Sequence, residues 1–445
     1  MLILIIFQGI TVKFFQGYWK VILALTYTFL DFIVVKVKRE LIVTETPISQ
    51  QLSHSSTLAG YDIEKAVLER YRASAKQQEP SLCCPTEYEG NYLDILPQEI
   101  IEKDYGCGDP TRYVSVGETV LDLGSGAGKN CYILAQKVGA TGKVIGIDFN
   151  DEMLALARKY QSEIARKVGY CNTQFFKGKI QDLKLDLEKV EAWLQDNPIA
   201  SIEQFSQFDA QCDCLRDRSP LIHDSSIDVV ISNCVLNLVC PKDKQQLFQE
   251  IYRVLKRGGR AVISDIVCDE DPTPEILNNP ELWSGCISGA FREDLFLKMF
   301  EEVGFYGIEI LKRDEKPWQV IDGIEFRSVT VRAFKGKEGS CLERKQAIIY
   351  KGPWKQVQDD DGHTFCRGER MAVCDKTYQI LTNPNSPYAK DIIPVPPYQE
   401  ISLEAATNFS CKNKAIRHPK ETKGYNYHLT EINNDAGCCS PGECC

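Results

Sequence analysis

Histidine is scarce in this sequence, and the few histidines share no pattern. The five His residues are scattered over 445 positions, and no His-Glu-x-x-His motif occurs, so a zinc hydrolase of that type is excluded. Gly and Pro number only 30 and 20, which excludes a collagen-like or low-complexity chain. Positive charge is also in deficit. The formal net charge is −10 at pH 7, so we expect no nucleic-acid partner.

A long uncharged apolar run is missing as well. Residues 1–35 are very apolar, but Lys13, Lys20 and Asp31 interrupt them, so no run reaches the roughly 18 residues of a membrane span. The chain also lacks the basic start of a signal peptide. Our hypothesis is that residues 1–40 are an apolar extension arising from a mis-assigned start codon. A membrane anchor, with membrane contact through residues 1–35, is the alternative.

Cysteine, in contrast, is abundant. The chain has 19 cysteines, an odd number, so at least one thiol stays unpaired. They are spread along a long chain, which fits a reducing cytoplasm better than a secreted disulfide scaffold. We therefore expect a cytoplasmic protein whose thiols are either packed in the core or available for redox chemistry and soft ligands.

From Thr119 onward, short apolar segments alternate with helical ones. This alternation predicts an α/β fold with a doubly wound, mostly parallel Rossmann-like sheet. Asp151 is placed to cap the second of these helices. The predicted strands are 119–123, 144–148, 174–176, 227–232, 260–266, 307–311 and 326–334, and the predicted helices are 129–138, 151–168, 242–255 and 292–303.

Composition and pattern divide the chain into six segments. The region 184–225 stands out as a polar insertion with one helix near 188–194. The predicted segments are the extension 1–40, a helical segment 41–115, a cofactor-binding core 116–270 with the insertion 184–225, a substrate-binding part 271–340, a small β-rich module 341–405, and a largely irregular, Cys-rich tail 406–445.

The strongest motif is Val120-Leu-Asp-Leu-Gly-Ser-Gly-Ala-Gly128, a strand that runs into a glycine-rich turn before a helix. A dinucleotide fingerprint needs a third glycine at the position of Lys129. Glycines at 124, 126 and 128 instead suit a ligand without a pyrophosphate. The motif resembles motif I of the class I S-adenosylmethionine (SAM) methyltransferases. That resemblance implies that the loop backbone contacts the methionyl end of SAM, while nearby acidic and amide groups receive its ammonium.

Asp148 closes the next strand, where a carboxylate can accept both ribose hydroxyls of a nucleoside. A helix cap is the alternative role for it. The polar residues after the third strand stand where this fold usually contacts adenine. The predicted cofactor-binding residues are Tyr105, Asp122, Gly124, Gly126, Gly128, Asp148, Ile180, Gln181 and Asn233.

Three cysteines follow or precede predicted strands. Cys234 ends the fourth strand in Ser-Asn-Cys-Val-Leu-Asn-Leu, at the sheet edge where α/β proteins bind ligands. Cys107, in Tyr-Gly-Cys-Gly, and Cys286, in Gly-Cys-Ile-Ser-Gly-Ala, are flanked by glycines, which suggests close backbone approach. A lone cysteine after a strand is more often a small buried hydrophobe, and three together favour a site.

In this order around motif I, these sequences resemble the arsenite SAM methyltransferases, over roughly residues 80–340. The resemblance implies that Cys107, Cys234 and Cys286 bind As(III). It also implies that Cys83 or Cys84, in Leu-Cys-Cys-Pro, forms a redox pair with Cys107. The insertion 184–225 departs from the better-known members of the family. The tail thiols Cys438, Cys439, Cys444 and Cys445 are candidates for soft-metal capture, or else for a redox role.

The predicted function is SAM-dependent methylation of arsenite and methylarsenite for arsenic detoxification, with glutathione or thioredoxin as the thiol reductant. Thiolates are the ligands that soft acceptors prefer. Arsenic has no proton to lose, so no general base is needed, and none is evident. Two alternatives remain at this point: a SAM methyltransferase for a carbon or other heteroatom acceptor, and a metalloid-binding protein without turnover.

Overall fold

The computed structural model describes residues 60–77, 79, 88, 90–411 and 415–424. The predicted extension 1–40, the candidate redox cysteines Cys83 and Cys84, and the tail thiols at 438–445 lie outside these residues. Among the described residues, no helix combines the length and apolarity that crossing a bilayer requires.

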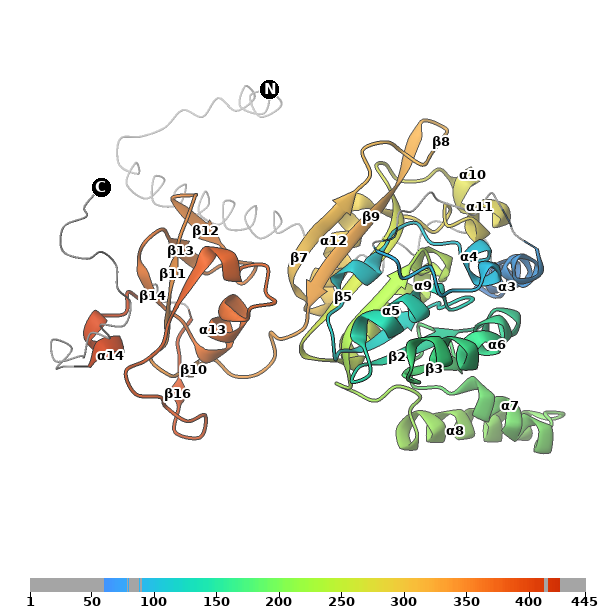
Figure 1. Cartoon of the computed structure of the whole chain (residues 1–445), viewed down its shortest axis with the longest axis horizontal. Helices are drawn as coiled ribbons and strands as arrows, with labels where there is room; N and C mark the ends of the chain where they lie inside the picture. The colour runs from blue at the N-terminus through green and yellow to red at the C-terminus, as the bar shows by residue number, and fades with distance from the viewer. Residues whose placement is uncertain (1–59, 78, 80–87, 89, 412–414, 425–445) are drawn as a thin grey trace, which may run out of the picture. The chain divides into compact units, whose positions relative to one another are not determined.

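The centre of the fold is a mostly parallel sheet, as the sequence predicts (Figure 1). Its main path runs β3-β2-β1-β4-β5-β9-β7, with β9 antiparallel to both of its neighbours. β6 pairs with β5 and β8 pairs with β9. These strands are β1 Thr119–Leu123, β2 Lys143–Asp148, β3 Thr173–Lys177, β4 Ile227–Asn233, β5 Leu255–Cys268, β6 Phe291–Arg292, β7 Tyr306–Arg313, β8 Gln319–Ile321 and β9 Ile324–Phe334.

The strand order explains where the helices and the ligand site lie. The chain steps outward from β1 to β3, then returns to β4 and steps the other way. Right-handed crossovers therefore put the helices of the two halves on opposite faces, and the reversal between β1 and β4 leaves a crevice at the strand ends. The helices are α3 Gly60–Lys76, α4 Gln98–Glu102, η2 Pro110–Tyr113, α5 Lys129–Val138, α6 Asp151–Val168, α7 Leu187–Asp196, α8 Ile202–Arg218, η3 Leu236–Leu238, α9 Pro241–Val254, α10 Pro274–Leu277, α11 Pro280–Ser284 and α12 Glu293–Val303.

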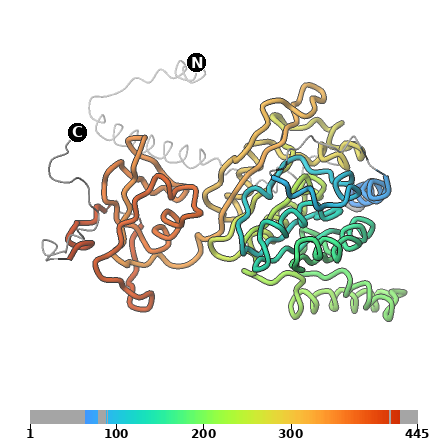
Figure 2. The backbone as a smooth tube through the Cα atoms, viewed as in Figure 1, coloured from blue at the N-terminus to red at the C-terminus, as the bar shows by residue number. Residues whose placement is uncertain are grey.

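Two details of the core differ from the prediction. Asp151 is not the cap of α6, because the Asn150 side chain accepts hydrogen bonds from the amides of Glu152 and Met153, while a carboxylate oxygen of Asp151 accepts from Lys177. The insertion 184–225 is more helical than expected. Besides α7 it forms α8, drawn in green in Figure 2. This helix buries Cys212 alone, so its sequence lacks the apolar stripe that reveals a helix.

A small module follows the sheet in the sequence. Its core contains Ile348, Phe365, Met371 and Leu381. Residues 406–445, predicted to be largely irregular, include the short elements β16 and α14 in their described part, and β16 pairs with β10. The module's elements are β10 Leu342–Glu343, β11 Ala347–Tyr350, β12 Gln356–Gln358, β13 Thr364–Cys366, β14 Arg370–Ala372, α13 Asp375–Thr382, η4 Ala389–Asp391, β15 Ile392–Val395, β16 Thr407–Asn408 and α14 Pro419–Lys423.

Candidate functional site

The glycine-rich turn between β1 and α5 has a backbone that only glycine adopts easily. Gly124, Gly126 and Gly128 have φ of 67°, 51° and 87°, all in the left-handed region. A Cβ on Gly124 would lie 2.5 Å from a methyl carbon of Val235. The loop is therefore built for close approach, as expected for a backbone that cradles a ligand.

Asp148 at the end of β2 is tied to this loop. Its carboxylate accepts hydrogen bonds from the Gly126 amide and from the Asn150 amide, both at 2.8 Å. Burial raises the pKa of Asp148, and these two amides oppose that rise. The carboxylate thus holds the turn in shape and lies at the edge of the cavity described next.

A cavity opens at the carboxyl ends of β1, β2 and β4. Seven of the nine predicted cofactor-binding residues line it, and the other two do not. Those that line it are Tyr105, Gly124, Gly126, Asp148, Ile180, Gln181 and Asn233, and Cys234 lines it as well. The cradle that a Cβ would fill at Gly124, together with acidic and amide groups on the walls, fits SAM.

Asp122 and Gly128 are placed behind this cavity. Asp122 is 1% exposed and accepts a hydrogen bond from the Cys131 thiol at 3.2 Å. Burial raises the pKa of Asp122 to about 8, and the charges of Asp104 and Asp148 add to the rise. Gly128 precedes α5 as its left-handed N-cap. Both residues support the loop from behind, and their predicted cofactor contact stays a prediction.

The three cysteines predicted to bind arsenic meet in one buried cluster. Cys107, Cys234 and Cys286 are 3%, 5% and 3% exposed and pack with Ile266 and Phe326. The Cys286 thiol donates to the Cys234 carbonyl at 3.2 Å. The three Sγ atoms do not all lie within 4.8 Å of one another, since the described groups that meet that limit lie elsewhere. Closing a three-thiolate site would therefore need thiol rotation.

Asn233 clamps the Cys107 loop onto the end of β4. Its Oδ1 accepts from the Cys107 amide at 2.9 Å and from the Gly108 amide at 3.0 Å, and its Nδ2 donates to the Gly108 carbonyl at 2.8 Å. Ser328 adds a hydrogen bond to the Cys107 carbonyl at 2.8 Å. An amide oxygen has two lone pairs, so these contacts use the oxygen fully. Asn233 lines the cavity, but its contacts are those of a residue that positions Cys107.

The backbone at two of the candidate ligands is left-handed. Cys234 has φ 61° and Cys286 has φ 64°, a region that residues other than glycine, asparagine and aspartate enter at a cost. Such strain clusters at functional sites, where the surrounding structure enforces it. At Cys234 the following backbone is held by Asp265, which accepts from the Leu236 amide at 2.9 Å.

Buried polar groups hold the loop that carries Cys286. Asn237 donates to the Cys286 carbonyl at 3.2 Å and to the Ile266 carbonyl at 2.6 Å. Lys244 donates to the Gly289 carbonyl. Burial lowers the pKa of Lys244 to about 8 and raises that of Asp265 to about 6. These groups fix the main chain around the thiol and do not reach its sulfur.

Helix α3 forms one wall of the cavity, a role that the sequence pattern does not predict. Glu64, Val67, Leu68 and Tyr71 line it. The Tyr71 hydroxyl lies 4.0 Å from the Cys286 Sγ. Burial raises the pKa of Tyr71 well above its ordinary value, with the neighbouring thiols adding to the rise. In the sequence, the apolar residues among the charged ones of 60–76 indicate that one side of this helix is buried. They do not indicate which part of the protein that side packs against.

Comparisons with known proteins agree with this geometry. A family model described as a methyltransferase domain matches residues 115–304, and one described as a domain of unknown function, DUF8838, matches residues 337–427. The chain is 31% identical to the arsenite methyltransferase of Aquipseudomonas alcaligenes, over 68% of this chain and 81% of that protein. It is 32% identical to the arsenite methyltransferase of Mus musculus, over 68% and 74%.

A solved structure was also found to be similar. It is an arsenic(III) SAM methyltransferase from Chlamydomonas reinhardtii, 27% identical, with a TM-score of 0.46 over 72% of this chain and 97% of that chain. The class I SAM methyltransferase fold predicted from the sequence is confirmed by the matching methyltransferase domain.

Proposed function

We propose that Cys107, Cys234 and Cys286 are the ligands that hold trivalent arsenic in this chain, which belongs to the arsenite methyltransferase family. The chain is an enzyme that methylates arsenic with SAM as the methyl donor.

The observation that carries the proposal is the buried cluster of three thiols beside the cavity. Cys234 belongs both to this cluster and to the cavity wall. An arsenic atom on these sulfurs would thus lie next to the cavity that fits SAM. The left-handed backbone at Cys234 and Cys286 is a further support, because packing alone gives no reason to place a cysteine there.

Three thiolates explain the chemistry without a base. They bind trivalent arsenic in a pyramidal arrangement and leave its lone pair free. SAM, when bound, supplies an electrophilic methyl group on its sulfonium. The residues need only hold the lone pair in line with the methyl position, so positioning is the main catalytic contribution. We assign SAM binding to the predicted residues that line the cavity, with Asp148 facing the ribose.

Methylation oxidises arsenic from the trivalent to the pentavalent state, so two electrons must be returned. Two thiolates supply them when they join in a disulfide, and glutathione or thioredoxin then reduces that disulfide. Our candidate pair is Cys107 with Cys83 or Cys84. In support, the Glu79 amide donates to the Tyr105 hydroxyl at 3.1 Å. This contact holds the chain at Glu79 beside the Tyr105–Cys107 segment, and Glu79 precedes Cys83 and Cys84 by four and five residues in the sequence.

We further propose that the enzyme serves arsenic detoxification in the cytoplasm, with arsenite and methylarsenite as its substrates. Nineteen cysteines spread along a long chain suit a reducing compartment. The insertion 184–225 follows the residues assigned to adenine in the sequence and precedes Cys234, so we assign it an influence on substrate choice.

The test is methyl transfer from labelled SAM to arsenite with glutathione or thioredoxin, beside a control without arsenite. Cys234→Ser and Cys286→Ser should each lose transfer at least a hundredfold while SAM binding, measured by calorimetry, stays within threefold. Cys240→Ser is the matched control, because Cys240 is buried and lines the same cavity but is not a predicted ligand.

Cys107→Ser should slow methylation of arsenite more than that of methylarsenite, which needs fewer sulfur ligands. Full activity in both Cys234→Ser and Cys286→Ser would refute the thiolate site. Equal losses on arsenite and methylarsenite in Cys107→Ser would refute the separate role of that cysteine.

A further inference from the structure

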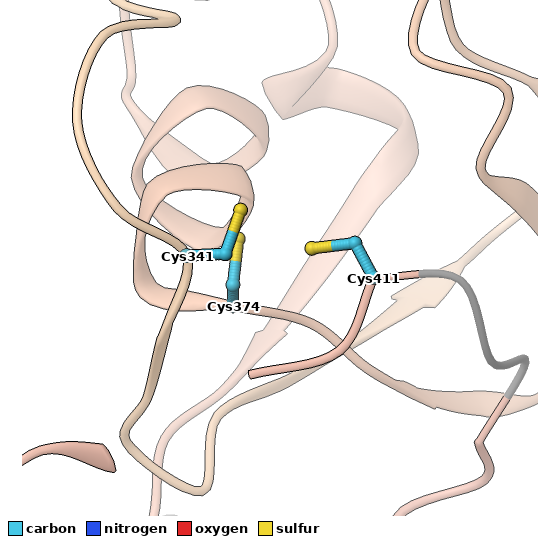
Figure 3. A group of neighbouring side chains, drawn as sticks. All are labelled: Cys341, Cys374 and Cys411. Atoms are coloured by element: carbon cyan, nitrogen blue, oxygen red, sulfur yellow. The ribbon is translucent and has the colours of Figure 1, made fainter. Parts of the chain in front are cut away.

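A second group of thiols lies in the C-terminal module, outside the site described above. The Sγ atoms of Cys341, Cys374 and Cys411 all lie within 4.8 Å of one another. Figure 3 shows the three side chains converging from separate segments of the chain. Cys374 is fully buried, and the other two are partly buried. We propose that these three thiols bind one trivalent arsenic atom.

The scaffold holds the sulfurs together from independent elements. Cys341 precedes β10 and Cys411 follows β16, and these two strands pair. The Phe409 amide donates to the Cys341 carbonyl at 2.9 Å, which closes the same pairing. The two partly buried cysteines are thus fixed relative to each other by backbone hydrogen bonds, not by chance side-chain contact.

Cys374 approaches from a helix end. It is the N-cap of α13, and its sulfur accepts from the Thr377 amide at 3.4 Å and lies 3.2 Å from the Thr377 hydroxyl. A cavity lined by Cys374, Cys411 and His363 adjoins the group, so a small ligand has space beside the sulfurs.

The donor set favours arsenic over zinc. Structural zinc sites are four-coordinate, whereas trivalent arsenic is satisfied by three sulfurs and keeps a lone pair. Among the described residues, no histidine nitrogen or carboxylate oxygen joins the three sulfurs within 4.8 Å. His363, the neighbouring candidate, is directed at Asp359 instead, with its Nδ1 2.8 Å from that carboxylate. The choice of arsenic over other thiophilic ligands rests on the activity of the chain.

The binding step balances without any oxidant or reductant. Arsenous acid, As(OH)₃, and three thiols give an arsenic tris-thiolate and three waters, as three As–S bonds replace three As–OH bonds. Each thiol proton leaves with one hydroxide. Burial and the two neighbouring thiols raise the pKa of Cys411, so it keeps its proton until the ligand arrives.

The experiment measures arsenic bound to the full-length chain, reduced with a phosphine so that no added thiol competes. Native mass spectrometry with sodium arsenite should show that Cys341→Ser and Cys411→Ser each bind one arsenic fewer than the unmodified chain. In the unmodified chain this arsenic should add its mass less three hydrogens. Cys366→Ser is the matched control, because Cys366 is a partly buried thiol of the same module outside the group, and it should bind as much as the unmodified chain.

Equal arsenic in all four proteins would overturn the proposal. So would a tightly held zinc ion that blocks arsenite and disappears in Cys411→Ser. Methyl transfer is measured on the same preparations and separates the two proposals. If Cys234→Ser and Cys286→Ser lose methyl transfer while the unmodified chain still binds one arsenic more than Cys341→Ser and Cys411→Ser, both proposals stand. If Cys234→Ser and Cys286→Ser keep full transfer while that difference of one arsenic persists, only the catalytic thiolates are refuted.

Discussion

Asn233→Ala should loosen the Cys107 loop and weaken both folding and catalysis. The change removes three hydrogen bonds of 2.8–3.0 Å between the Asn233 amide and the loop backbone. At about 1 kcal/mol each, their loss should lower the free energy of unfolding by about 3 kcal/mol. Two buried backbone amides, those of Cys107 and Gly108, lose their acceptor, which keeps the cost at or above this value.

The comparison variant is Ser328→Ala. It removes one hydrogen bond, of 2.8 Å, to the Cys107 carbonyl of the same loop, so about 1 kcal/mol should be lost. Equilibrium urea unfolding of both variants measures how much each one loses in free energy of unfolding, and the loss in Asn233→Ala should be about three times that in Ser328→Ala. Methyl transfer should fall in the same order, and more with arsenite than with methylarsenite, because Cys107 moves away from Cys234.

The opposite pattern would refute this reasoning. Suppose that the free energy of unfolding of Asn233→Ala lies within about 0.5 kcal/mol of that of the unmodified protein, but the variant binds SAM tenfold more weakly. Asn233 then contacts the cofactor and does not position the loop. That result would restore the role that the sequence predicts for it.

Three further predictions concern the cofactor loop and its surroundings. Asp148→Ala should weaken SAM binding at least tenfold by calorimetry, because the Gly126 amide loses the acceptor that shapes the turn; unchanged affinity would refute this role. The pKa of Asp122, raised to about 8, means that the folded state binds the proton more tightly than the unfolded state, so stability should fall as pH rises from about 4 to 8. In urea unfolding, the free energy of unfolding of Asp122→Asn should depend less on pH. If the variant and the unmodified protein show the same pH dependence, the raised pKa of Asp122 is contradicted. Gly106→Ala should lose methyl transfer at least tenfold, because the new Cβ would lie 2.1 Å from the Asn233 amide, whereas Gly142→Ala, which meets Val138 away from the cavity, should keep it.

The sheet could be predicted because its strands are apolar runs and its loops carry glycine. β1, α5 and the end of α12 match the predicted bounds closely. β5 begins earlier than expected, at Leu255, because pairing with neighbouring strands extends it through polar residues. Helix α8 is absent from the prediction because it buries only one residue, and a helix without an apolar stripe gives no periodic signal in the sequence.

The two thiol groups show where sequence reasoning reaches its limit. Cys107, Cys234 and Cys286 stand out because each belongs to a motif beside a strand end. Cys341, Cys374 and Cys411 have no such motif, so the sequence alone predicts no role for them. Backbone pairing between β10 and β16 brings two of them together, and a pattern in the sequence does not encode that long-range contact. The same holds for α3, whose place on the cavity depends on tertiary packing.

The left-handed backbone at Cys234 and Cys286 sets stability and chemistry against each other. Glycine would adopt these angles without the roughly 1–2 kcal/mol penalty of a side chain. Removing a buried side chain also costs packing, here together with the hydrogen bond from the Cys286 thiol to the Cys234 carbonyl. Cys234→Gly and Cys286→Gly should therefore lower the free energy of unfolding less than the same change in regular backbone would. If these sulfurs bind arsenic as proposed, such variants would remain folded and lose methyl transfer, so directed evolution of this enzyme for robustness needs an activity filter in every round.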